Sequence, residues 1–381
     1  MFRGLALSPA GVEVNIAFDT GISADLVEAV RLSWASMKPR EIELDSPAGQ
    51  PRTILLTDRN LSEVLAEFGR QGSYTPHLVH VRSAARAQER LTVEVTLRLL
   101  EALAGKLSLF HAAALGDSAS RAAMILIGPS GRGKTTAARF LGRHFAYLSD
   151  ETAVVQPNHT VRPYPKPLSV IDNPHQPKVQ YDPAAAGLSP AAPDDFSYTL
   201  RRIILLDRRE EPVEAHLEPV ALADALLEIV EQTSGLVKTE DGVGKLIALI
   251  EACGGVQRLT YHEIHQALDL LRENLQKPTL AQAFPVKYFA PTEAGSLQRG
   301  QLHRAPAASG FLMDERLLIL QDSQFFELSP FAADCWLAAG QAVSLGELKV
   351  QLEKIYGPIP GEDFSRVIEQ MVEARVLQQA A

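Results

Sequence analysis

The residues from Gly128 to Thr135 have the types and spacing of a phosphate-binding loop. They read Gly-Pro-Ser-Gly-Arg-Gly-Lys-Thr and satisfy the P-loop (Walker A) pattern G-x-x-x-x-G-K-[ST]. Glycines at these positions let backbone N–H groups turn inward around phosphate oxygens. Lys134 would neutralise the β- and γ-phosphates, and the Thr135 hydroxyl would reach a magnesium ion. The sequence therefore predicts a site for a nucleoside triphosphate with Mg²⁺.

An apolar strand and a helix must hold this loop in place. Residues 122–127 form an uninterrupted apolar run that ends at Gly128, and a helix is expected to begin near Lys134. The positive end of the helix dipole would then point at the bound anion. The sequence lacks the N-K-x-D arrangement typical of guanine recognition, which favours ATP. The residues expected to contact the nucleotide are Gly128, Pro129, Ser130, Gly131, Arg132, Gly133, Lys134, Thr135 and Thr136.

Two sets of acidic residues could complete the site. Asp150 and Glu151 follow the expected helix, so a short loop and a strand would return them beside the phosphates. One carboxylate could then hold Mg²⁺ while the other accepts the proton of an attacking hydroxyl. Asp207 ends the apolar strand RRIILLD and is the alternative, Walker B-like acid. A solvated acid pair and an aspartate that merely opens a turn are the structural alternatives.

The stretches LFHAAAL, MILIGPSGRGKTTAARFL and LSDETAVV, in this order, resemble the catalytic core of the HPr kinase/phosphorylase (HprK) family. The resemblance covers about residues 98–275. It implies that Asp150 takes the proton from a substrate serine hydroxyl and that Glu151 supports the metal. Asp150 and Glu151 would then face Mg²⁺ together with Thr135. It also implies that His111, in a strand expected from Leu107 to Leu115, lies near the phosphates.

Lys166 is a further candidate, in the stretch PYPKPLSVI at residues 163–171. This stretch lies where the HprK family carries an arginine-glycine segment. The comparison implies that Lys166 supplies a positive charge near the transferred phosphoryl group. A proline-rich surface loop is the alternative interpretation.

The remaining sequence suggests three further parts. Residues 1–97 mix short alternating stretches with a helical one, which indicates an N-terminal α+β domain of unknown role, either a substrate platform or a structural cover. Residues 98–275 alternate strands and helices, as an α/β P-loop kinase domain would. Residues 276–305 are rich in proline and are expected to be a linker. Residues 306–381 are expected to form a small third domain.

The last part resembles a PqqD-like domain. The matching features are the hairpin LLILQDSQFFELS, the helix through Trp336 and two amphipathic helices that end near Leu377. The resemblance implies a winged-helix fold and a RiPP recognition element, which binds a ribosomal precursor peptide as an added strand. The alternative is a module that packs on the kinase domain or mediates self-association.

Composition excludes several classes of protein. With 46% hydrophobic and 22% charged residues the chain is expected to be globular. The net charge of −9 argues against nucleic acid as the main partner. Cys253 and Cys335 are too few for a disulfide framework. No apolar run approaches the length of a membrane helix, so a cytoplasmic protein without a membrane partner is expected. A homo-oligomer is possible.

These observations predict an ATP- and Mg²⁺-dependent kinase that phosphorylates a serine or threonine hydroxyl, on a precursor peptide held by the C-terminal domain. Asp150, Lys134, His111 and Lys166 are the expected catalytic residues. Thr135, Glu151 and Asp150 are the expected metal-binding residues. The alternatives are a kinase for a small molecule, such as an amino acid or a sugar, and a nucleotide-gated binding protein without kinase activity.

Overall fold

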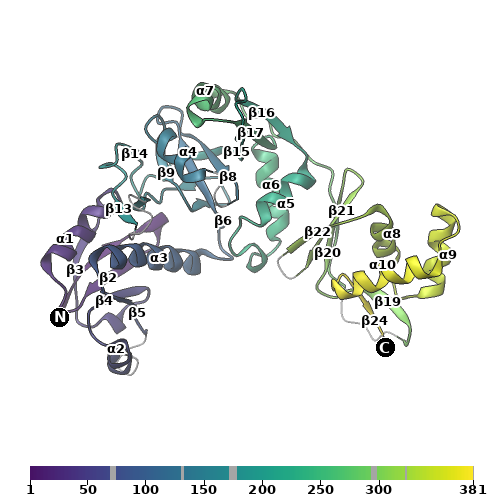
Figure 1. Ribbon diagram of the computed structural model, residues 1–381, viewed down its shortest axis with the longest axis horizontal. Coiled ribbons are helices and arrows are strands. Elements are labelled where there is room, and N and C mark those ends of the chain that lie inside the picture. The colour runs from purple at the N-terminus through teal and green to yellow at the C-terminus, as the bar shows by residue number, and fades with distance from the viewer. Residues whose placement is uncertain (69–73, 130–132, 171–177, 293–297, 322–323, 381) are drawn as a thin grey trace. The chain divides into compact units, whose positions relative to one another are not determined.

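The chain is organised into two compact units. The first comprises Met1–Val220 and Gln232–Gln282, and the second comprises Ala221–Glu231 and Ala283–Ala381 (Figure 1). Helices and strands alternate through both units, so the fold is mixed α/β. The computed structural model describes residues 1–68, 74–129, 133–170, 178–292, 298–321 and 324–380.

The first unit begins with a five-stranded sheet. Its strand order is β3-β1-β2-β4-β5, with β1 antiparallel to both neighbours and β4 parallel to both of its own. The apolar residues of α1 and α3 pack with the sheet in one core around Trp34. The elements are β1 (Phe2–Leu7), β2 (Val14–Phe18), α1 (Ala24–Ser33), β3 (Arg40–Leu44), β4 (Thr53–Thr57), α2 (Leu61–Phe68), β5 (His77–His80) and α3 (Ala84–Leu103).

The long helix α3 has a clear start signal and a buried apolar face. The Ser83 hydroxyl accepts a hydrogen bond from the N–H of Arg86, as an N-cap residue does. Leu91, Val95 and Leu99 recur every four residues and are fully buried, which places them on one face of the helix. Because this face belongs to the N-terminal core, α3 is fixed firmly to the five-stranded sheet.

A seven-stranded sheet carries the phosphate-binding loop. Its order is β14-β9-β7-β8-β15-β17-β16, in which β8, β15 and β17 are parallel and β7 runs antiparallel between β8 and β9. Helices α4 and α7 pack on one face, where Leu141 and Leu271 are fully buried. The elements are β7 (Ala112–Gly116), β8 (Ala122–Ile127), α4 (Lys134–Leu141), β9 (Ala146–Ser149), β14 (Ser189–Pro190), β15 (Thr199–Arg208), β16 (His216–Val220), α6 (Gly242–Ala252), β17 (Val256–Tyr261) and α7 (Leu268–Gln276).

Two small sheets lie beside it. One has the order β11-β10-β6 and the other pairs β12 with β13. The single strand expected from Leu107 to Leu115 is therefore wrong, because β6 and β7 belong to different sheets and the chain bends at His111 between them. The elements are β6 (Ser108–Phe110), β10 (Ala153–Val155), β11 (Val161–Arg162), β12 (Leu168–Val170) and β13 (Val179–Tyr181).

The second unit contains two antiparallel sheets and four helices of the described chain. The sheets have the orders β18-β20-β21-β22 and β23-β19-β24. Its core surrounds the fully buried Trp336, and the Arg304 guanidinium lies 3.8 Å from the centre of that ring. The elements are α5 (Leu222–Val230), β18 (Lys287–Phe289), β19 (Gln301–Arg304), β20 (Ser309–Met313), β21 (Arg316–Gln321), β22 (Gln324–Leu328), α8 (Pro330–Ala338), β23 (Val343–Ser344), α9 (Leu345–Tyr356), α10 (Gly361–Glu373) and β24 (Leu377–Gln379).

The boundaries of the two units differ in places from the domain boundaries expected from the sequence. Residues 276–305 hold β18 and β19, which pair with strands of the second unit. Helix α5 groups with that unit although both of its chain neighbours belong to the first. Residues 1–97 and the P-loop sheet form a single unit. None of the helices in the described part of the chain is both long and apolar enough to cross a membrane.

Candidate functional site

The carboxyl end of β8 and the start of α4 flank the phosphate-binding loop. Every residue of β8 is buried, so this strand fixes the position of Gly128 within the sheet. Gly133 precedes α4 with a φ of 87°, a left-handed conformation that favours glycine. The buried Lys134 ammonium donates a hydrogen bond to the carbonyl of Gly128 and so closes the loop. Ser130, Gly131 and Arg132, also expected to contact the nucleotide, lie outside the described residues.

A pocket of about 430 Å³ opens at this point and contains most of the predicted site. The helix α4 presents its first turn to the pocket, with its N–H groups and positive dipole end. The expected residues that line the pocket are His111, Gly133, Lys134, Thr135, Thr136, Asp150, Glu151 and Lys166. The strand order explains this, because β7 lies antiparallel between β8 and β9, so the ends of β8 and β9 and the start of β7 share one edge of the sheet.

Asp150 and Glu151 stand in a tight turn after β9. The Ser149 hydroxyl accepts the N–H groups of Glu151 and Thr152, at 3.4 and 3.1 Å, which fixes the backbone of the acid pair. Asp150 is buried, whereas the side chain of Glu151 is 44% exposed. The two carboxylates therefore differ in their access to solvent.

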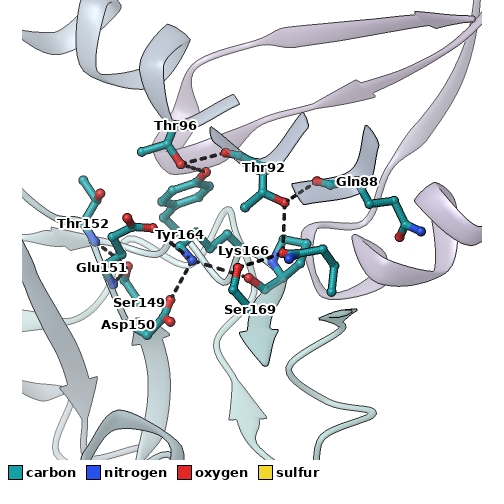
Figure 2. Close-up of polar contacts among 12 residues, drawn as sticks. Gln88, Thr92, Thr96, Ser149, Asp150, Glu151, Thr152, Tyr164, Lys166 and Ser169 are labelled. Carbon is teal, nitrogen blue, oxygen red and sulfur yellow. Dashed lines mark hydrogen bonds and ion pairs between the residues drawn. The ribbon is translucent and has the colours of Figure 1, made fainter. Parts of the chain in front are cut away.

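Lys166 lies between the two carboxylates. Its Nζ is 3.3 Å from Oδ1 of Asp150 and 3.0 Å from Oε2 of Glu151 (Figure 2). Burial by itself lowers the pKa of Lys166, but the charges of Asp150 and Glu151 outweigh burial and raise it. The Lys166 ammonium in turn lowers the pKa of Glu151. Lys166 is thus a permanently charged group within the pocket.

The donor set around the acids suits a magnesium ion. Oδ1 of Asp150 is buried and accepts no hydrogen bond from the described residues, although Lys166 is close by. Such an oxygen gains from a further cation. Mg²⁺ is typically held by one or two carboxylates together with phosphate oxygens. Asp150, Glu151 and the Thr135 hydroxyl provide this set at one pocket.

His111 reaches the pocket from the bend between β6 and β7. Its backbone N–H donates to the carbonyl of Gln232 at 2.6 Å, and its imidazole is exposed at the pocket wall. Partial desolvation and the nearby charge of Lys134 lower the pKa of His111. At neutral pH the imidazole is therefore uncharged and can either donate or accept a hydrogen bond.

Asp207, the alternative acid, is not among the residues that line this pocket. Its Oδ2 forms an ion pair with Nη2 of Arg209 at 2.6 Å and accepts a hydrogen bond from Thr260 at 3.3 Å. The structure thus separates Asp207 from the acid pair and gives its carboxylate local partners at the end of β15.

Two pocket residues were not predicted from the sequence. Ser169 on β12 and Lys178, directly before β13, also line the pocket. The positive charge of Lys178 also helps to lower the pKa of Glu151. Neither residue belongs to a recognisable motif, and their placement depends on the pairing of β12 with β13.

We expect Glu151→Gln to destabilise the protein more at neutral pH than in acid. Because Lys166 lowers the pKa of Glu151, the ionised carboxylate stabilises the folded state above the unfolded pKa of about 4.5. This contribution is lost as the pH falls through the lower, folded pKa. Urea unfolding at about pH 7 and about pH 3.5 should show that the difference in unfolding free energy shrinks in acid. An equal difference at both pH values would contradict the expectation, and Glu41→Gln, at an exposed position on β3, serves as the control.

The chain was compared with known families, proteins and solved structures. No protein-family model matches the chain, and no curated protein matches it. Among solved structures, the chain is similar to the HPr(Ser) kinase/phosphatase from Coxiella burnetii, with 14% sequence identity and a TM-score of 0.24. The match covers 44% of this chain and 93% of that chain. Function is therefore inferred from the pocket itself.

Proposed function

We propose that this protein is a kinase that transfers the γ-phosphoryl group of ATP to a hydroxyl group with the help of Mg²⁺. One observation carries the proposal. A single pocket combines the end of the P-loop and the start of α4 with the acid pair Asp150 and Glu151. A phosphate-binding loop alone would suit any nucleotide-binding protein, but a buried carboxylate at the same pocket adds a base for a hydroxyl nucleophile.

The residues that line the pocket have different roles in this reaction. Lys134 and the first N–H groups of α4 bind the phosphates, because they present positive charge and hydrogen-bond donors. Thr135 and Glu151 are suited to hold Mg²⁺, with Asp150 beside them. The ion, when bound, neutralises charge on the β- and γ-phosphates. His111 stands at the pocket wall as an uncharged hydrogen-bond partner for a phosphate oxygen or for the acceptor.

Asp150 is assigned the role of the base. The hydroxyl oxygen of the acceptor attacks the γ-phosphorus, the bond from that phosphorus to the bridging oxygen breaks, and ADP leaves. The hydroxyl proton passes to the carboxylate of Asp150, which lies buried at the pocket. The Lys166 ammonium lies 3.3 Å from Oδ1 of Asp150 and adds positive charge beside the transferred group.

For the acceptor we propose a serine or threonine hydroxyl of a precursor peptide, held by the second unit. Strand addition to a sheet edge is a common way to bind an extended peptide. In the described part of the second unit, β22 and β24 each stand at one edge of a sheet, and β24 packs beside the last helix α10. The PqqD-like sequence features lie in the same residues.

The test is a transfer reaction with full-length protein, γ-labelled ATP and clarified lysate of the source cells, with and without Mg²⁺. We expect a labelled peptide that appears only with Mg²⁺. Amide exchange should then slow in β22 or β24 when that peptide is added. A labelled metabolite in place of a labelled peptide would show that the acceptor is a small molecule. Nucleotide binding without any transfer would overturn the kinase proposal in favour of a nucleotide-gated binding protein.

A further inference from the structure

The segment that carries Lys166 has few means of holding itself in place. Residues 163–167 read Pro-Tyr-Pro-Lys-Pro, and proline has no backbone N–H. Only Tyr164 and Lys166 can therefore donate from the main chain. The N–H of Tyr164 donates to the carbonyl of Leu148 at 2.7 Å, and that of Lys166 donates to the carbonyl of Tyr164 at 2.9 Å. The carbonyl of Pro163 also accepts a hydrogen bond from the N–H of Ala10 at 3.2 Å, and side chains outside the segment add further contacts.

Helix α3 contacts the chain at Tyr164, two residues before this lysine. The Tyr164 ring is fully buried in the N-terminal core, which also contains Val95. Its hydroxyl lies 2.8 Å from Oγ1 of Thr96. Since the Thr96 hydroxyl already donates its one proton to the carbonyl of Thr92, at 3.0 Å, the Tyr164 hydroxyl is the donor to Thr96.

The same helix also holds the residues that follow Lys166. The Ser169 hydroxyl donates to Oε1 of Gln180 at 3.0 Å, which ties β12 to β13. The Thr92 hydroxyl lies 3.0 Å from the carbonyl of Gln88 and 3.3 Å from the same oxygen of Gln180, so these two acceptors share its one proton (Figure 2). Both Thr92 and Gln180 are buried, so water does not compete for these bonds.

We call Thr92 and Thr96 of α3, together with the contacts of their hydroxyls, the clamp. Thr92 and Thr96 are four residues apart and thus lie on the same face of the helix. Threonine is a poor helix former, so two of them in the interior of α3 lower its intrinsic stability. The Thr96 hydroxyl contacts Tyr164 before Lys166, and the Thr92 hydroxyl lies near Gln180, which binds Ser169 after Lys166.

We propose that Thr92 and Thr96 are positioning residues that hold the Lys166 ammonium between Asp150 and Glu151. The N-terminal region is then a support of the phosphoryl-transfer site, and its removal or displacement disorders that site. The effect of this support on catalysis rests on the proposed kinase function. The positioning of Lys166 by the two threonines does not depend on that function.

Thr96→Val tests the clamp with little change in shape. The variant loses the hydroxyl that accepts from Tyr164, and Thr96→Ser restores it. We expect kcat to fall between about tenfold and a hundredfold in Thr96→Val, with KM for ATP unchanged, because Lys134 and the P-loop are untouched. Thr53→Val is the matched control, since Thr53 is a buried threonine on β4 whose hydroxyl donates to the carbonyl of Gln50.

A second measurement reports on Lys166 without any transfer reaction. Full-length protein is treated briefly with acetic anhydride, and acetylation of Lys166 is quantified by mass spectrometry relative to the exposed Lys354. In the wild type the buried, ion-paired Lys166 should be protected. We expect the rate of Lys166 acetylation to rise at least about tenfold in Thr96→Val. In Thr96→Ser and in Thr53→Val the rate should equal that of the wild type.

The two measurements separate the two proposals. Faster acetylation together with lower kcat supports both. Faster acetylation in a protein whose wild type transfers no phosphate supports the clamp and removes the kinase function. Acetylation of Lys166 that is equal in Thr96→Val and Thr53→Val overturns the clamp, even if both variants lose thermal stability.

Discussion

Asp150→Asn should lower the rate of phosphoryl transfer by about 10³-fold or more while nucleotide binding stays within about threefold of the wild type. An asparagine amide has nearly the shape of the carboxylate but cannot accept the hydroxyl proton. The groups that bind phosphate, Lys134 and the start of α4, remain in place. Single-turnover transfer from labelled ATP measures the first quantity, and calorimetric titration with ATP measures the second.

Asp207→Asn is the matched control for this substitution. It changes a strand-end aspartate of the same sheet that is not among the lining residues of the pocket and already pairs with Arg209. We expect transfer by Asp207→Asn to remain within about threefold of the wild type, because a carboxylate away from the reacting atoms makes no proton transfer. Loss of transfer in Asp207→Asn with activity retained in Asp150→Asn would assign the chemistry to the other acid.

Lys166→Met should destabilise the protein by about 3 kcal/mol and also abolish efficient transfer. The side chains of Lys166 and Asp150 are 4% and 5% exposed, so the substitution leaves a buried carboxylate without its cation. Breaking a buried pair in this way is costly because the remaining charge is neither hydrated nor paired. Urea unfolding at neutral pH measures the change in unfolding free energy.

The double variant Lys166→Met with Asp150→Asn distinguishes a lost ion pair from lost packing. If the buried charge of Asp150 causes the instability, its neutralisation should recover part of the unfolding free energy. The double variant would then be more stable than Lys166→Met alone. If the losses of unfolding free energy from the two substitutions simply add, the instability of Lys166→Met comes from the methionine itself. The ion pair of Lys166 and Asp150 then does not stabilise the fold.

The P-loop and its neighbours could be predicted from sequence because the signals are local. The apolar run 122–127 coincides with β8, and the helix after it begins at Lys134. Glycine spacing and strand hydrophobicity both act over a few residues, so no tertiary information is needed. The position of Asp150 could be predicted in the same way, because the short strand β9 that follows α4 brings this residue to the pocket.

Other parts of the site depend on contacts between distant segments. Thr92 and Thr96 of α3 meet Gln180 and Tyr164, which lie 88 and 68 residues further along the chain. Ser169 likewise enters the pocket through the pairing of β12 with β13. A lone threonine in a helical stretch gives no sequence signal of such a contact, because its hydroxyl can equally bond to its own helix.

His111 lies at the pocket although the single strand expected around it is wrong. The apolar residues from Leu107 to Leu115 suggest one strand, but a strand pattern does not reveal a change of sheet. Because β7 runs antiparallel between β8 and β9, its first residue, rather than its last, lies at the edge that holds the P-loop. His111 precedes that residue and therefore reaches the pocket.

The chain order of the two units has a consequence for synthesis on the ribosome. Helix α5 belongs to the second unit and packs against β22, yet residues 232–282 of the first unit follow it in the chain. Its residues Leu226 and Ile229 are buried, and β22 emerges well after the helix. During that interval α5 lacks the cover that β22 provides, and exposed apolar surface is the kind that chaperones bind and that promotes aggregation. A chain that stops before β22 would keep this exposure permanently.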